Sequence, residues 1–276
     1  MIELSVTCIA RPGATLIAPV GLSTPDAAVT EVTMTGGSAR LVADPLAGLH
    51  VLAIRPEARE LRLTYRFQRG GAAYPEAIFT PRDSRYTRSA DALATEARQV
   101  ALAAGGGSAA IRALANHVAG QFRYGHPEER YYEGHDEIPQ LCGLTEGSCV
   151  DINAYFIACC RAAGLQAGYV TGAFVPEEKR DWCEDMHCWV VTRSDAGVQE
   201  WDIAHHLKLG RADIAPGLNP KPGVRVPLAH SMGLNFPALG IHDLKLIGEP
   251  MWLTSEGTWL DANPRFQLAG YELLAA

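Results

Sequence analysis

GSCVDINAYFIACCRAAGLQAGYVTGAF, residues 147–174, is the most informative stretch of the chain. The apolar run that begins at Val150 and stops at Gly164 predicts a buried helix, with Cys149 in its first turn. Leu165–Phe174 is composed mainly of apolar and small residues and predicts a strand. A helix followed by strands favours an α+β fold over alternating βαβ units.

Two further strands are predicted downstream. His187–Thr192 and Val198–Ile203 contain many of the β-branched and aromatic residues that favour extended structure. Residues 211–240 are instead rich in proline and glycine, so we expect loops there.

Upstream, apolar residues recur at helical spacing. Helices are predicted from Ser89 to Ala104 and from Ser108 to about Phe122, separated by Gly105–Gly107. Residues 125–139 form a polar segment that contains several His and Glu side chains. So long a loop inside a compact chain is typical of a functional segment.

The first seventy residues alternate between apolar and polar side chains, as in Ile2–Cys8 and Leu61–Phe67. Turn signals such as Gly36-Gly37 and Asp44-Pro45 separate the strand-like runs. We therefore expect an N-terminal antiparallel β unit over residues 1–70 and an α+β domain over residues 71–276.

Composition narrows the class of protein. The 276 residues are 47% hydrophobic and 20% charged, which is typical of a globular chain. A net charge of −7 disfavours nonspecific binding to nucleic acid or acidic membranes, and no run approaches the ~18 apolar residues of a membrane helix. Seven cysteines, an odd number, and an N-terminus without a basic leader predict reduced thiols in the cytoplasm.

One of these cysteines, Cys149, has a chemical context. A thiol at a helix N-terminus faces unpaired backbone N–H groups and the positive end of the helix dipole, which both favour the thiolate. The same N–H groups can bind a developing oxyanion, and Gly147 and Ser148 leave room for a substrate. Because a cysteine in an apolar helix is more often a packing residue, position alone does not identify a nucleophile.

Two downstream residues complete a candidate triad. His187 begins one predicted strand and Asp202 lies in the next. Neighbouring antiparallel strands would present this imidazole and carboxylate side by side, and a helix end against them would add the thiol. Each residue taken alone could have an ordinary structural role, so the prediction of a triad depends on the order of all three.

The four blocks around these residues resemble the transglutaminase-like superfamily of papain-type cysteine enzymes. The blocks are Gly147–Asp151, Arg161–Gly172, His187–Val190 and Trp201–Asp202. The resemblance covers roughly residues 110–206. It implies a papain/transglutaminase-like core, in which the helix carrying the cysteine packs on an antiparallel sheet, preceded by a small N-terminal β unit.

The resemblance also implies a role for each residue: Cys149 as nucleophile, His187 as general base and acid, and Asp202 as the group that orients the imidazole. The chain departs from the family after Asp202, where Ile203-Ala204 replaces the frequent Pro-Thr. Family members take a second oxyanion donor from an upstream side chain. The candidates in this chain are Tyr124, Gln140 and Gln121.

A metal site is the competing interpretation of the same region. Five soft or borderline ligands fall within residues 183–206, namely Cys183, His187, Cys188, His205 and His206. The segment lacks a Cys-x-x-Cys pair, and the spacing from Cys183 to Cys188 is unusual for zinc. We therefore expect no metal and no cofactor. Calcium, which some animal relatives require, finds no acidic ligand cluster here.

The resulting hypothesis is a thiol acyl-transfer enzyme that acts on peptide or glutamine amides through a thioester on Cys149. Family analogy favours hydrolysis, as by a cysteine protease or amidase. Deamidation and amine transfer share the intermediate and remain open, and an inactive binding scaffold of the same fold is the alternative from another class. The expected partner is a peptide or protein substrate, not nucleic acid or a membrane.

Overall fold

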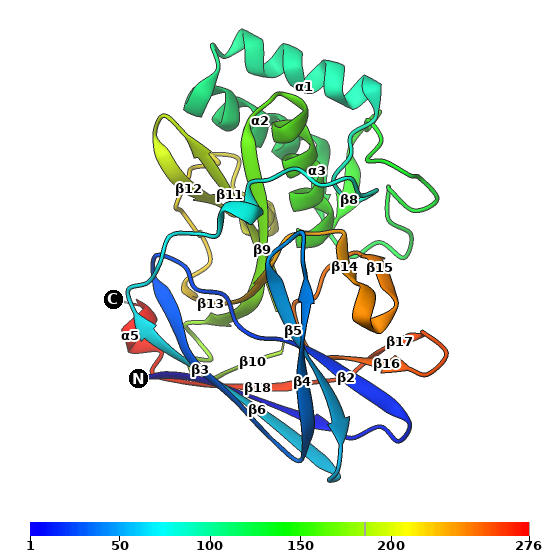
Figure 1. Cartoon of the computed structure of the whole chain (residues 1–276). Helices are drawn as coiled ribbons and strands as arrows, with labels where there is room; N and C mark the ends of the chain where they lie inside the picture. The colour runs from blue at the N-terminus through cyan, green and yellow to red at the C-terminus, as the bar shows by residue number, and fades with distance from the viewer. Residues whose placement is uncertain (185, 276) are drawn as a thin grey trace.

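The computed structural model describes residues 1–184 and 186–275. Helices α1, α2 and α3 gather at one end of the molecule and most strands at the other (Figure 1). The helices are α1 (Asp91–Ala103), α2 (Gly107–Gln121), α3 (Cys149–Ala162), α4 (Ile203–Lys208) and α5 (Glu272–Ala275), with 3₁₀ turns η1 (Glu76–Ile78) and η2 (Pro237–Leu239). None of the helices in the described residues is long and apolar enough to cross a membrane.

The α+β core is built on an antiparallel sheet with strand order β12-β11-β9-β13. Its strands are β9 (Gln166–Pro176), β11 (Met186–Ser194), β12 (Gly197–Trp201) and β13 (Gly223–His230). On one face, Tyr169 and Val190 pack in a buried cluster with residues of α1, α2 and α3. The adjacent residues, Val170 on β9 and Trp189 on β11, pack with Tyr74, Ile78 and Phe79 of the segment that precedes α1. The sheet is thus covered on both faces.

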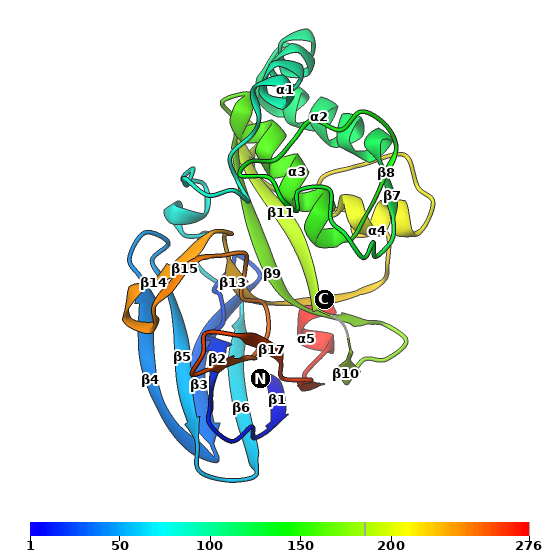
Figure 2. The ribbon, with the colours of Figure 1, turned by 90° about the vertical axis from the view of Figure 1, so that its right-hand side faces the viewer.

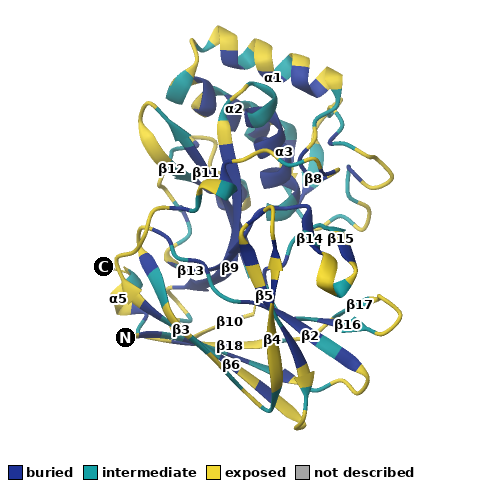
Figure 3. Ribbon diagram, viewed as in Figure 1, coloured by how far each residue is buried: buried dark blue, intermediate teal, exposed yellow. Residues whose placement is uncertain are grey.

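Helix α3 is a core helix, as predicted, since all of Asp151–Cys160 is buried. Figure 3 shows burial concentrated in α3 and β9, whereas α1 exposes its outer side. Before α3, β7 (Phe122–Tyr124) pairs in parallel with β8 (Thr145–Gly147). A Cβ on Gly147 would lie 2.9 Å from the Phe122 ring, so the chain can enter α3 here only because residue 147 lacks a side chain.

The β unit consists of two five-stranded sheets, with orders β10-β18-β1-β6-β3 and β17-β16-β2-β5-β4. Leu4 and Leu63 of the first sheet share a buried cluster with Leu16 and Ile54 of the second, so the sheets pack face to face (Figure 2). The strands are β1 (Ile2–Ile9), β2 (Ala14–Pro19), β3 (Ala27–Thr35), β4 (Gly37–Asp44), β5 (Leu49–Pro56), β6 (Glu60–Arg69), β10 (Trp182–Cys183), β16 (Met251–Thr254), β17 (Trp259–Asp261) and β18 (Arg265–Ala269).

The expected N-terminal β unit is present, but strands from far along the chain complete it. β18 pairs with β1, and β16 pairs with β2. The period-two pattern of the first seventy residues predicts strands, but it carries no information about these distant partners. The division of the chain at residue 70 stays a prediction.

Two expectations for the region after β12 were wrong. Residues 223–230 form β13 rather than a loop, and β13 accommodates Pro227 because it is an edge strand with a bulge between Pro227 and Ala229. Asp202 does not continue a strand, since β12 ends at Trp201 and Asp202 is the N-cap of α4. After β13 the chain forms the small hairpin of β14 (Leu234–Phe236) and β15 (Ile241–Leu244).

Candidate active site

The first turn of α3 holds Cys149 in a fixed position. The preceding residue, Ser148, donates its N–H and its hydroxyl to Asp151 at 2.7 and 2.6 Å. Arg130, from the polar segment 125–139, donates to both oxygens of Asp151 at 2.6 and 2.7 Å. Because Arg130 offsets the charge of this carboxylate, Asp151 can anchor the turn with less penalty to a thiolate at Cys149.

Cys149 hydrogen-bonds to the Cys188 thiol and to His187, which are neighbours in β11. The contact with Cys188, followed by the hydrogen bond and charge of His187, lowers the pKa of Cys149 well below its usual value, although burial opposes this. Burial raises the pKa of Cys188 well above its usual value. Cys188 is therefore the thiol that donates, and Cys149 is the thiolate that accepts.

His187 links the thiolate to a carboxylate. Its Nε2 lies 2.9 Å from Oδ2 of Asp202, which leaves Nδ1 for Cys149. Burial disfavours a charge on His187, but Asp202 and then Cys149 outweigh it and raise the pKa of His187 to about 9. Burial likewise works against the charge on Asp202, yet His187, His205 and Arg225 hold its pKa well below the usual value. The arrangement favours thiolate, imidazolium and carboxylate at neutral pH.

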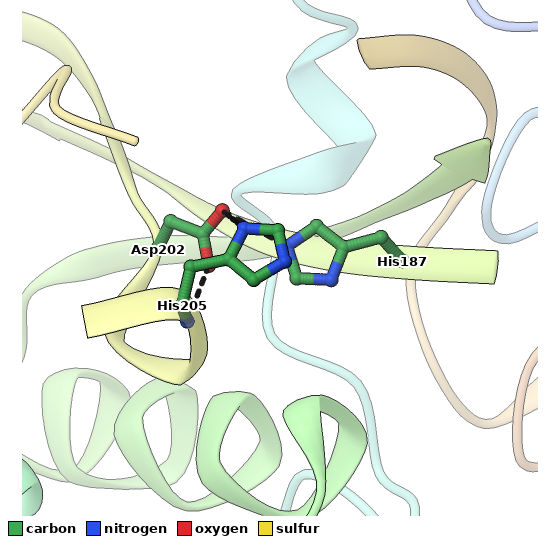
Figure 4. Close-up of side chains that lie close together, drawn as sticks. All are labelled: His187, Asp202 and His205. Atoms are coloured by element: carbon green, nitrogen blue, oxygen red, sulfur yellow. Dashed lines mark hydrogen bonds and ion pairs between the residues drawn. The ribbon is translucent and has the colours of Figure 1, made fainter. Parts of the chain in front are cut away.

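Asp202 is fully buried and is oriented by several donors. Its Oδ1 accepts the backbone N–H of His205 at 3.1 Å, which caps α4. Its Oδ2 accepts from Arg225 Nη2 at 2.8 Å and also lies 3.1 Å from Nδ1 of His205. Figure 4 shows the imidazoles of His187 and His205 beside Asp202. The two rings stack with centroids 3.9 Å apart and planes 10° from parallel.

The three residues predicted to form a triad therefore lie together. His205 was expected from the sequence only as a possible zinc ligand, and Arg225 was not expected at the site. The i, i+3 spacing of Asp202 and His205 could have indicated their contact, because the side chain of an N-cap residue bonds to the backbone two or three residues later. Arg225 gave no signal, because it lies in the segment that was expected to form loops.

The composition of this cluster also fits a metal site. Ligand atoms of His187, Asp202 and His205 lie within 4.8 Å of one another. However, lone pairs in the planes of two nearly parallel stacked rings do not converge on a point ~2 Å from each nitrogen, as zinc requires. Oδ2 of Asp202 is also already occupied by Arg225. This geometry favours a hydrogen-bonded site over a metal site.

A cavity of about 300 Å³ opens beside Cys149 and is also lined by His187, His205 and Tyr124. The other two candidates for the second oxyanion donor are engaged elsewhere. Gln121 Nε2 lies 2.9 Å from His117, and Gln140 donates to Glu96 at 3.0 Å. Of the three candidates, Tyr124 is the one that lines the cavity, and its hydroxyl lies 3.4 Å from Nε2 of His126.

Comparisons with known proteins agree with this picture. Residues 92–201, which span α1 to β12, match the model of the Transglutaminase-like superfamily core. The resemblance inferred from the sequence motifs is therefore confirmed for this segment, which contains Cys149 and His187 and ends one residue before Asp202. A comparison with curated protein sequences gave no significant match.

Several solved structures resemble the chain. One is a candidate cysteine protease from Cytophaga hutchinsonii, 16% identical, with a TM-score of 0.54 over 97% of this chain and 96% of that one. Another is the periplasmic domain of TgpA from Pseudomonas aeruginosa, 12% identical, with a TM-score of 0.40 over 76% of this chain and 90% of that one. The first likeness extends over both the core and the β unit. The fold is thus α+β, with a transglutaminase-like core preceded by a β-rich region.

Proposed function

We propose that the chain is a thiol acyl-transfer enzyme that hydrolyses peptide or glutamine amides, as a cysteine protease or amidase does. The observation that carries this proposal is the contact series from Cys149 through His187 to the buried Asp202. A low-pKa thiol, a charged imidazole and an orienting carboxylate are the groups that nucleophilic acyl transfer needs.

In the proposed reaction, the Cys149 thiolate attacks the amide carbonyl carbon and forms a tetrahedral intermediate. His187 then gives its proton to the leaving nitrogen, the C–N bond breaks and a thioester remains on Cys149. A water molecule gives a proton back to His187 as it attacks the thioester, which releases the acid and restores the thiolate. An amine in place of water would give amine transfer instead.

The developing oxyanion needs donors near the thiolate. Backbone N–H groups at the start of α3 are available because the first turn of a helix leaves them without intrahelical partners. We assign the second donor to the Tyr124 hydroxyl, which belongs to the same cavity as Cys149. A Tyr124→Phe variant is expected to lose about 10- to 100-fold in kcat, whereas Gln121→Ala and Gln140→Ala are not.

The proposed substrate is a peptide or a protein, and the proposed location is the cytoplasm. The seven cysteines, all in the described part of the chain, form no disulfide bond with one another, which is consistent with a reducing compartment. No metal or cofactor enters the proposed mechanism.

Selective alkylation tests whether Cys149 is the activated thiol. Iodoacetamide at pH 6–7 is expected to label Cys149 first, although Cys142 is the more exposed cysteine. Labelling that follows exposure, with Cys142 ahead of Cys149, would favour an inactive scaffold. Cys142→Ala serves as the matched control, since it should leave the rate at Cys149 unchanged.

The reaction itself is tested by mass spectrometry of a glutamine-containing peptide library, incubated with the protein with and without an added amine. Cleaved peptides would support the proposed hydrolase. A gain of about one mass unit would indicate glutamine deamidation, and an amine adduct would indicate transfer. Products that persist in Cys149→Ala would contradict the proposal altogether.

A further inference from the structure

Arg225 reaches the candidate triad from the opposite edge of the core sheet. It lies on β13, at one edge, whereas Asp202 follows β12, at the other edge. Its guanidinium lies 5.1 Å from the ring centroid of Trp189 on β11, and Nη2 donates to Oδ2 of Asp202 at 2.8 Å. A side chain that crosses strands to contact one buried carboxylate is not a surface ion pair.

The far end of Arg225 is itself held. Nη1 donates to Oε2 of Glu200 at 2.9 Å, and the Tyr74 hydroxyl donates to the same carboxylate. The side chain of Arg225 is only 15% exposed, so both ion pairs are largely shielded from water. Arg225 is thus fixed between two carboxylates, one of which is Asp202.

We infer that Arg225 is a positioning residue of the candidate active site: it orients Asp202 toward His187 and, by its charge, limits how strongly that carboxylate holds a proton on His187. This inference rests on the proposed function and goes beyond the predicted triad. Without the cation of Arg225, the negative charge of the buried carboxylate would be uncompensated, and it would stabilise the protonated imidazole more strongly. An imidazolium held too firmly would give up its proton to the leaving group less readily.

The other charged groups around His187 do not duplicate this effect. Cys149, Asp202 and His205 touch the imidazole directly. At the rim of the cavity, Lys179 pairs with Glu184 at 3.0 Å, and Lys221 pairs with Glu178 at 2.6 Å. The ammonium group of Lys208 lies 5.3 Å from the ring centroid of Tyr124, and the ring of His126 packs against the same tyrosine. Among the described residues, Arg225 is the cation that forms an ion pair with Asp202 through a guanidinium or ammonium group.

The test is the pH dependence of Cys149 alkylation by iodoacetamide, which needs no substrate. The wild-type rate is expected to rise in two steps, a lower one where Cys149 loses its proton and an upper one where His187 does. In Arg225→Gln the plateau rate should fall about tenfold, because Asp202 loses a charged hydrogen bond. The upper step should move to higher pH by about one unit, because a cation has been removed near His187.

Arg225→Lys, which keeps the charge, should leave the upper step in place. Arg193→Gln is the matched control, because Arg193 also lies on the core sheet but pairs with Glu76 at the surface. Circular dichroism and thermal unfolding of each variant separate local effects from loss of fold.

Each outcome has one meaning. Preferential labelling of Cys149 in the wild type with an unmoved upper step in folded Arg225→Gln would overturn the role of Arg225 and leave the proposed function standing. An equal shift in Arg225→Lys would overturn the role of its charge. If Cys149 in the wild type reacts no faster than the other thiols, both proposals fail.

Discussion

The two ends of α3 carry cysteines in opposite chemical states. At the first residue, contacts with Cys188 and His187 lower the pKa of Cys149. In the last turn, burial raises the pKa values of Cys159 and Cys160 well above the usual range. One helix therefore carries a thiol whose pKa is lowered, at the wall of the cavity, and two buried thiols whose pKa values are raised.

The helix dipole contributes to this difference, since its positive end lies at Cys149 and its negative end near Cys160. The contacts of the thiols differ as well. Hydrogen-bond donors reach Cys149 from β11, whereas the surroundings of Cys159 are mainly apolar. We therefore expect the reactivity of each thiol to depend on the groups that contact it.

The largest effect is expected for Cys149→Ala. Removal of the nucleophile should lower turnover by at least about 10³-fold, while Cys159→Ala and Cys160→Ala, at the other end of the same helix, should retain activity. The measurement is amide turnover with whichever peptide the library identifies. Comparable losses of turnover in the Cys149, Cys159 and Cys160 variants would show that the cysteines at the two ends of α3 do not differ in function.

Asp202→Asn should have the next largest effect. The amide keeps the shape but not the charge, so His187 loses the partner that favours imidazolium and fixes its ring; kcat should fall about 10²- to 10⁴-fold. Thermal unfolding of the variant, measured alongside, checks that α4 has kept its cap, which asparagine also supports. Full activity in a folded Asp202→Asn would remove Asp202 from the triad.

The pH profile should show where the imidazolium is lost. Because the pKa of His187 is raised from 6.5 to about 9, activity should persist to about pH 9 and then fall roughly tenfold per unit. The free energy of unfolding gains from this group below pH 6.5, and the gain is lost as the pH rises through about 9. His187→Gln should show neither change. An alkaline limit near pH 6.5 would instead indicate an unpaired imidazole.

The smallest effect on activity is expected from Cys160→Ala, where only packing is changed. Cys160 is completely buried, and loss of its sulfur should lower the free energy of unfolding by about 1–2 kcal/mol. Urea denaturation measures the change, and the alkylation rate of Cys149 should be unaltered. A slower Cys149 in this variant would mean that the two ends of α3 are coupled.

The contrast within α3 was predictable in part from the sequence. Small residues before Cys149, the apolar run after it and the glycine that ends it define a helix with a cysteine at its start. The order of Cys149, His187 and Asp202 then suggested a candidate triad, and the structure places His187 Nε2 2.9 Å from Oδ2 of Asp202.

The features of the site that could not be predicted from the sequence depend on pairings between distant segments. Arg225 lies in a segment whose proline and glycine content indicates loops, and only its pairing beside β9 carries it to Asp202. The hydrogen bond from Cys188 to Cys149 was likewise missed, since strand alternation places Cys188 away from His187. Asp202 was predicted to lie in a strand, but it is the N-cap of α4, and this capping role depends on a short helix that the sequence pattern did not indicate.

The pairing of β18 with β1 has a consequence for how the chain is made. β6 can pair with one edge of β1 early in synthesis, but the other edge waits until residues 265–269 have emerged. At ~5–20 residues per second, that delay is roughly ten to forty seconds. During that interval β1 keeps an unpaired edge, and an open strand edge can pair with another chain.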